Sequence, residues 1–177
     1  MAEIKSTLDL VMEKTKNLSL SSEERAAQKN MDIEGRIRGL LRKFKDRALN
    51  IDHFKTEYQK LQKDYDLSEN THLIKEICGQ IELGEDNKDM FGLLAEFKVT
   101  DIEGLTTVLQ EFQNVLDTAA GRRSKILRAQ LAKTHLISGS AVVPNLENDD
   151  EWRKETGEIR TEFEAKLNKV KTELLAG

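Results

Sequence analysis

IEGRIRGLLRKFKDRALNIDHFKTEYQKLQKDY, residues 33 to 65, carries the strongest structural pattern in the chain. Its apolar residues recur at alternating spacings of four and three, and Arg47 is the single charged member of the row. A repeat of seven residues keeps one stripe of side chains facing a partner helix, which is the geometry of a coiled coil or a long bundle helix. The row consists of Ile33, Ile37, Leu40, Phe44, Arg47, Ile51, Phe54, Tyr58, Leu61 and Tyr65.

The start and the length of this helix can also be predicted. Ser21 followed by Glu24 is a capping box, in which the hydroxyl and the carboxylate bind backbone N–H groups that the first turn leaves unpaired. No proline interrupts the chain between Met1 and Val143. The pattern therefore predicts one continuous helix over residues 21–66, roughly 65 Å long at about 1.5 Å per residue.

Composition indicates the class of fold. Of 177 residues, 38% are hydrophobic, 34% are charged and only 5% are aromatic, which favours narrow apolar stripes over a thick interior. We expect an all-α fold, an elongated helical bundle with long coiled-coil helices, in a single domain over 1–177. The expected segments are an N-terminal helix at 1–20, the long helix at 21–66, two short helices within 67–98, a second long helix at 100–134, a hairpin or loop at 135–147 and a C-terminal helix at 148–177.

Two further capping patterns place the starts of later helices. Thr100 with Glu103 repeats the capping box at the second long helix, and Asn148 with Glu151 is a weaker signal at the last helix. Apolar residues again recur at helical spacings after the first of these patterns. This second row runs through Ile102, Leu105, Leu109, Phe112, Leu116, Ala119 and Ile126, with Arg123 as its polar exception.

The segment LISGSAVVP, residues 136 to 144, has no helical pattern. Its β-branched and apolar residues flank a Ser-Gly-Ser turn and Pro144 ends it, which predicts a small β-hairpin or an extended loop between the last two helices. A two-stranded hairpin is marginal alone, so its side chains need the bundle, a second copy or a partner peptide as a surface. The expected interaction tip consists of Leu136, Ile137, Val142 and Val143.

Basic residues gather in two places, although the net charge of the chain is −4. One cluster lies between Arg36 and Arg47, and the other lies between Arg122 and Lys133. Phosphate neutralisation needs several cations along one track, but no stacking aromatic or recognition motif accompanies these arginines. A solvated charged face and an anion-binding face both stay open. The candidate anion-binding residues are Arg36, Arg38, Arg42, Lys43, Arg122, Arg123 and Arg128.

Signatures of catalysis and of metal binding are missing from the sequence. It contains no GxxxxGK[ST], GxGxxG, GxSxG or HExxH motif. Glu69 and His72 have the Glu-x-x-His spacing of di-iron bundles, but such sites need a second motif, which is absent. Cys78, the only cysteine, lies among apolar residues and is expected to be a buried neutral thiol. We therefore expect no enzyme activity, no catalytic residue, no cofactor, no metal and no small-molecule substrate.

The sequence also lacks signals for export or for the membrane. Residues 1 to 10 alternate charged with apolar residues and contain no apolar signal-peptide core. No apolar run approaches the roughly 20 residues that span a bilayer. We expect a cytoplasmic, soluble protein with no membrane partner.

The opening sequence MAEIKSTLDLVMEKTKNL, residues 1 to 18, and the arginine-rich stretch after it resemble the start of small helical proteins of unknown function from anaerobic bacteria. This resemblance covers about a quarter of the chain and implies no functional residue. A hairpin between two long helices is also similar to the arm and tip of prefoldin-type chaperones, by analogy of shape alone.

Two functions follow as hypotheses. The first is a non-enzymatic protein–protein interaction or chaperone-like scaffold that forms a homo-oligomer and contacts another protein. It rests on the apolar rows and on the expected tip. The second is a nucleic-acid or ribosome-associated protein that binds through the two basic clusters.

Overall fold

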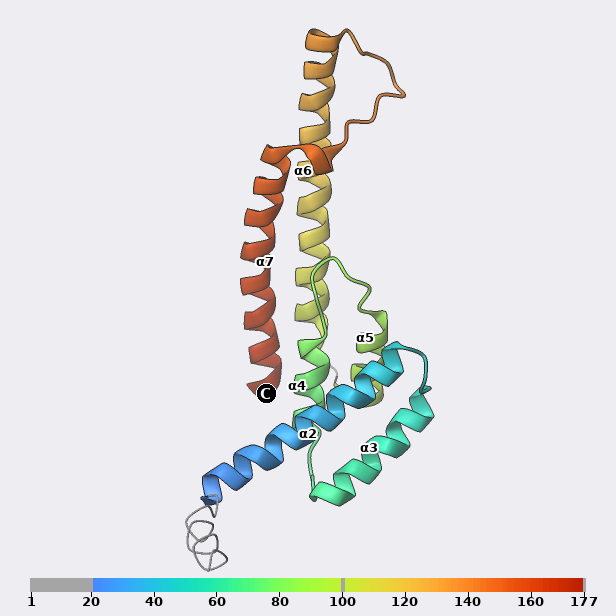
Figure 1. The fold of residues 1–177 in the computed structure, drawn as a ribbon, viewed down its shortest axis with the longest axis vertical. Helices are drawn as coiled ribbons and strands as arrows, with labels where there is room; N and C mark the ends of the chain where they lie inside the picture. The colour runs from blue at the N-terminus through green and yellow to red at the C-terminus, as the bar shows by residue number, and fades with distance from the viewer. Residues whose placement is uncertain (1–20, 100, 177) are drawn as a thin grey trace, which may run out of the picture. The chain divides into compact units, whose positions relative to one another are not determined.

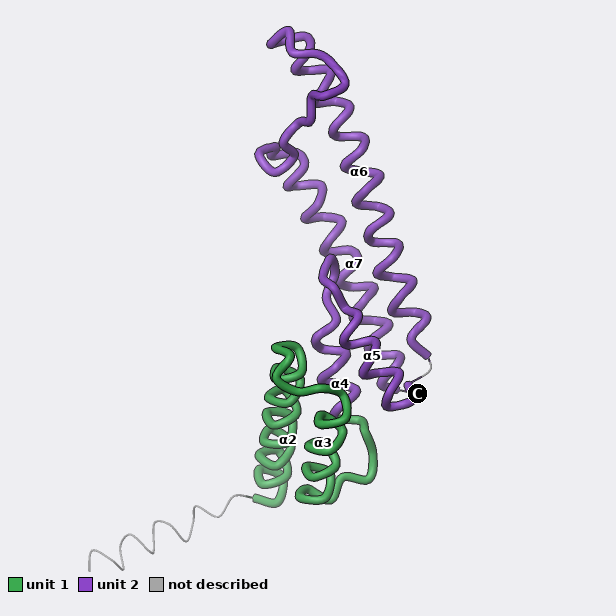
Figure 2. The backbone as a smooth tube through the Cα atoms, turned by 90° about the vertical axis from the view of Figure 1, so that its right-hand side faces the viewer, with its two compact units in different colours: residues 1–72 green, residues 73–177 purple. Residues whose placement is uncertain are grey.

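The computed structural model describes residues 21–99 and 101–176, and within these ranges the protein consists of helices and the loops that join them (Figure 1). These ranges contain no strand, so the all-α class is confirmed for them. The chain divides into two compact units, one that ends at His72 and one that begins at Leu73 (Figure 2). The helices are α2 (Ser22–Lys45), α3 (Ile51–Tyr65), α4 (Thr71–Gly79), α5 (Lys88–Glu96), α6 (Glu103–His135) and α7 (Asp150–Ala176), with a short 3-10 helix, η1 (Leu146–Asn148).

The first unit contains a helical hairpin in which α2 and α3 run antiparallel, side by side (Figure 2). The prediction of one continuous helix over 21–66 is therefore wrong, because α2 ends at Lys45 and α3 begins at Ile51. The absence of proline permitted a continuous helix but did not require one. The chain reverses direction between the two helices although no proline lies there.

Three residues account for this reversal. The backbone N–H of Asp46 donates to the carbonyl oxygen of Arg42 and closes the last turn of α2. Arg47 has a φ of 60°, the left-handed conformation that ends many helices. Asn50 then caps α3, because its side-chain oxygen accepts a hydrogen bond of 2.8 Å from the backbone N–H of His53. The charged exception in the seven-residue row is thus part of the turn.

Six of the ten members of the seven-residue row are buried, and all six lie on α2 or α3. The rings of Phe44 at the end of α2 and Phe54 at the start of α3 meet edge to face, with centroids 5.7 Å apart. Leu41 is buried and Leu40 is only half-buried, so Leu41 takes the place predicted for Leu40, and the other predicted positions on α2 are buried. The buried side chains of the hairpin are Ile33, Ile37, Leu41, Phe44, Phe54, Tyr58 and Leu61. At Phe44 and Phe54, the contact that a coiled coil would take from another chain comes from the neighbouring helix of the same chain.

In the second unit, α6 and α7 run antiparallel, and the loop between α4 and α5 contacts α7 (Figure 1). The ammonium of Lys171 donates a hydrogen bond of 2.7 Å to the carbonyl oxygen of Ile81. Asn87 holds this loop together, since its buried amide accepts from the backbone N–H of Glu82 at 3.0 Å and donates to the carbonyl oxygen of Glu82 at 2.8 Å. Phe112 and Phe163 join α6 to α7, with ring centroids 5.6 Å apart.

The capping patterns have different outcomes. The capping box at α2 is confirmed: Ser21 Oγ accepts from the N–H of Glu24 at 3.1 Å, and Glu24 Oε2 accepts from the N–H of Ser21 at 2.7 Å. Thr100 lies outside the described residues, and Ile102 at the N-cap of α6 makes no side-chain cap. At α7, the cap is Asp149 and not the predicted Asn148, which belongs to η1. The predicted N-terminal helix at 1–20 also lies outside the described residues, and the single domain stays a prediction.

The segment 136 to 144 forms an extended loop, so the predicted β-hairpin is wrong and its alternative holds. Leu136 ends α6 in the left-handed conformation with a φ of 55°. The N–H of Val142 donates to the carbonyl oxygen of Gly139 at 3.3 Å, a turn that no pair of strands extends. Valine and isoleucine favour strands only where a neighbouring strand or surface covers them, and Ile137 and Val143 of this loop are exposed.

Candidate functional site

Helix α6 continues beyond the point where α7 begins (Figures 1 and 2). Arg123 on α6 pairs with Asp149, the residue just before α7, so the twelve residues from Ser124 to His135 extend past that level. At about 1.5 Å per residue, the extension is about 18 Å long. We call residues 124–145, the end of α6 with the loop that follows, the distal arm, and residues 136–144 its apex.

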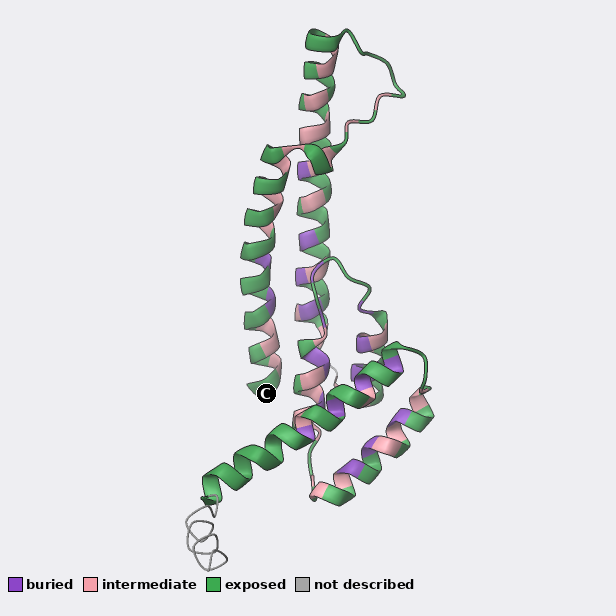
Figure 3. Cartoon of the chain, viewed as in Figure 1, coloured by how far each residue is buried: buried purple, intermediate pink, exposed green. Residues whose placement is uncertain are grey.

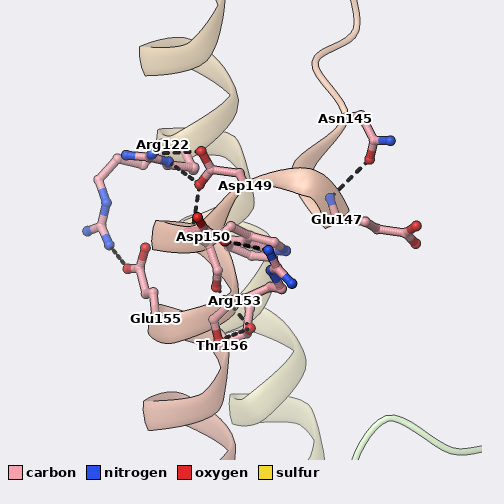
Figure 4. A network of polar contacts seen from close by, with 10 residues as sticks. Arg122, Asn145, Glu147, Asp149, Asp150, Arg153, Glu155 and Thr156 are labelled. Atoms are coloured by element: carbon pink, nitrogen blue, oxygen red, sulfur yellow. Dashed lines mark hydrogen bonds and ion pairs between the residues drawn. The ribbon is translucent and has the colours of Figure 1, made fainter.

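The base of the distal arm is fixed by one ion pair with two hydrogen bonds (Figure 4). The guanidinium of Arg123 donates from Nε to Asp149 Oδ1 at 2.7 Å and from Nη2 to Asp149 Oδ2 at 2.8 Å. Asp149 Oδ1 also accepts from the backbone N–H of Trp152 at 2.8 Å and thereby caps α7. The two side chains are only 17% and 14% exposed, so this pair is shielded from solvent. The hydrogen bonds from Arg123 hold the pKa of Asp149 below its usual range, and the N–H of Trp152 adds to that effect.

Two of the three candidate anion-binding residues of the second cluster lie beside carboxylates. Arg122 pairs with Glu155 of α7 (Figure 4). Arg123 pairs with Asp149 as described. Arg128 is exposed on the distal arm and makes no ion pair with the described residues. The sequence placed these carboxylates more than twenty residues from the arginines, so only the antiparallel packing of α6 and α7 shows the pairing.

The first cluster lies on α2 of the other unit and is also locally paired. Arg36 lies 3.5 Å from Asp32 and over the ring of Tyr65, with 5.3 Å from its guanidinium carbon to the ring centroid. Arg42 lies 3.9 Å from Asp46. Arg38 donates to the carbonyl oxygen of Glu34, and Lys43 lines a shallow pocket with Glu57. These cations therefore do not form one unopposed track.

The apex carries most of the expected tip on its surface (Figure 3). Leu136 is 88% exposed, Ile137 is 50% exposed and Val143 is 80% exposed, whereas Val142 is half-buried. Large apolar side chains with this exposure are normal when scattered, but these follow one another within one short loop. The apex is thus an apolar surface at the free end of a helix.

Sequence reasoning missed a second surface, which we call the open face. Along α6, Val115, Ala119, Arg122 and Ile126 follow one another at spacings of four, three and four and so form one stripe. Val115 is 40% exposed and Ile126 is 42% exposed. Ile159 of α7 lies beside the stripe in a groove of about 360 Å³. The groove is lined by Asn114, Val115, Thr118, Ala119, Arg122, Glu155 and Ile159.

These surfaces offer apolar and ionic contacts. In residues 21–99 and 101–176, no three histidine, cysteine, aspartate or glutamate side chains come together as metal ligands. Cys78 is 1% exposed, and burial raises the pKa of its thiol, in agreement with the predicted neutral buried group. Over the same ranges, no helix combines the length and the hydropathy that crossing a membrane requires.

Comparison of the chain with protein-family models, curated proteins and solved structures gives no match. The function is therefore argued from the residues of the open face and the distal arm.

Proposed function

We propose that this protein is a non-enzymatic scaffold that self-associates through the open face of α6 and α7. The observation that carries this proposal is the half-exposed stripe beside the groove. Val115 and Ile126 are ordered on a helix, at core spacing, and yet each exposes about two fifths of its surface. A pair of helices leaves part of each apolar stripe uncovered, and four helices cover it.

A second copy suits this face better than an unrelated ligand does, because the face is self-complementary in charge. Arg122 and Glu155 stand on opposite walls of the groove and pair across it. A copy related by a twofold axis presents the same two residues in reverse order, so each cation meets a carboxylate. Both charges lie at the rim of an apolar strip formed by Val115, Ala119 and Ile159. Dimer interfaces commonly combine such a strip with a polar rim.

Light scattering coupled to size exclusion tests the proposal. We expect the wild-type protein to have about twice the 20.2 kDa mass of one chain. Val115→Glu combined with Ile126→Glu places charges on both half-exposed positions and should give a monomer with unchanged helical circular dichroism. Met31→Glu is the matched control, because Met31 is 71% exposed on α2 and lies outside the open face. A wild-type monomer at all concentrations, or a double variant that remains a dimer, would refute self-association through this face.

The chaperone-like form of the first hypothesis and the nucleic-acid hypothesis have less support from the described residues. Chaperone-like capture of a peptide by edge pairing needs a strand, and the apex forms none. Nucleic-acid binding needs several unopposed cations along one track, and four of the seven candidate residues, Arg36, Arg42, Arg122 and Arg123, have carboxylate partners. Nucleic acid that copurifies with the protein, is detected by absorbance at 260 nm and is lost on a high-salt wash would reverse this ranking.

A further inference from the structure

The distal arm contains no acidic residue. From Thr118 to Leu146 the chain has no aspartate or glutamate but has five lysines and arginines. Arg122 and Arg123, at the base of the arm, are neutralised by carboxylates. The cations that remain exposed farther along α6 are Lys125, Arg128 and Lys133. This end of α6 therefore has an unopposed positive charge, although the whole chain is negative.

The apex beyond these cations is uncharged and apolar. No charged residue occurs from Leu136 to Leu146. Leu136, Ile137 and Val143 expose their side chains, and none of them contributes to the buried core of the described residues. Leu136 also has a φ of 55°, which glycine adopts with less strain than leucine. The fold therefore gains little from a leucine at this position, and the exposed side chain is better explained by an external contact.

The order of these groups along the arm fits one kind of partner. Lys133 lies three residues before Leu136 and Arg128 lies eight residues before it, or about 4.5 Å and about 12 Å along the helix. Apolar side chains of peripheral proteins enter a bilayer by about 5–10 Å, and cations behind them lie at the level of the headgroups. Contrary to the expectation of no membrane partner, we propose that the distal arm docks onto the surface of an anionic lipid bilayer, with the apex inserted and Lys125, Arg128 and Lys133 against the headgroups.

Other partners fit the distal arm less well. A nucleic acid would use the cations but not the exposed apolar apex, and residues 124–145 contain no Phe, Tyr or Trp on which a base stacks. A second copy that meets the apex tip to tip would bring two sets of like charges together. The proposal concerns the distal arm and does not depend on self-association through the open face.

Co-sedimentation with lipid vesicles tests this proposal on the full chain. The probes are vesicles of phosphatidylcholine with about 30% phosphatidylserine and vesicles of phosphatidylcholine alone. We expect binding to the anionic vesicles at about 0.1 M NaCl, little binding to the neutral ones, and a large loss at about 0.5 M NaCl. Arg128→Gln with Lys133→Gln, and separately Leu136→Ser with Val143→Ser, should each weaken binding by at least about tenfold. None of these four side chains is buried, so the variants should fold.

Matched control variants distinguish vesicle binding by the distal arm from the effects of net charge and of self-association. Lys29→Gln with Lys154→Gln removes the same charge from exposed positions outside the arm and should leave vesicle binding within about twofold of wild type. Val115→Glu lies outside the arm and should keep salt-sensitive binding even where it removes the dimer. Absence of binding to anionic vesicles at low salt would overturn the proposal. So would binding that is unchanged by Leu136→Ser with Val143→Ser, or tighter binding to an RNA oligonucleotide that survives that change.

Discussion

Asp149 has two roles at one carboxylate, since it caps α7 and pairs with Arg123. Substitutions can separate these roles. Asp149→Asn keeps a side chain that caps helices well but removes the charge, whereas Asp149→Ala removes both. We expect the melting temperature to fall in both variants, by several degrees in Asp149→Ala and by less in Asp149→Asn. Glu155→Gln, at the far more exposed pair with Arg122, should change the melting temperature least.

The pH dependence follows from the lowered pKa of Asp149 in the folded state. A carboxyl group whose folded pKa lies below its unfolded value stabilises the fold above the unfolded pKa, and this contribution is lost as pH falls through the folded pKa. The difference in melting temperature between wild type and Asp149→Asn should therefore be constant near neutral pH and shrink below about pH 4. Thermal melts across this range measure it. A difference that does not change with pH would show that the charge of Asp149 contributes nothing.

At the scale of the helices, two glycines of α6 report how closely α6 and α7 pack. A Cβ added at Gly104 would lie 2.9 Å from Cγ1 of Val170 on α7, and a Cβ added at Gly121 would meet nothing within 4 Å. Alanine stabilises a helix interior by about 1 kcal/mol relative to glycine. We expect Gly121→Ala to raise the free energy of unfolding by about that amount, and Gly104→Ala to give no gain or a loss, because valine is stiff at χ1. Urea titration measures both, and equal gains would contradict the close approach at Gly104.

The sequence predicted the type of most elements but not how they are joined. The helical rows and the capping box at Ser21 required only local spacing, which a single sequence displays. The reversal at Arg47 and Asn50 was missed because the row of apolar residues continues through it with the same spacing. Asn50 three residues before His53 was the available signal. At the candidate site, the ion pairs of Arg122 and Arg123 were missed, because a contact between two helices depends on their register and not on local spacing.

At the scale of the whole molecule, each unit has a core of its own. The buried side chains of α2 and α3 include Phe54, which meets Phe44, and those of α6 and α7 include Phe112, which meets Phe163. The division of the chain at His72 separates the first pair from the second. A substitution in one core should therefore weaken the helices of its own unit before it weakens those of the other.

Native-state hydrogen exchange tests this expectation. Phe54→Ala deletes a fully buried ring and should cost about 3–5 kcal/mol. Since about 1.4 kcal/mol corresponds to a factor of ten, the slowest amides of α2 and α3 should exchange at least about 100-fold faster, while those of α6 and α7 keep their protection. Phe112→Ala is the matched substitution in the second unit and should give the opposite pattern. If either variant accelerates exchange equally in all four helices, the chain unfolds as one cooperative body, and the predicted single domain over 1–177 is the better description.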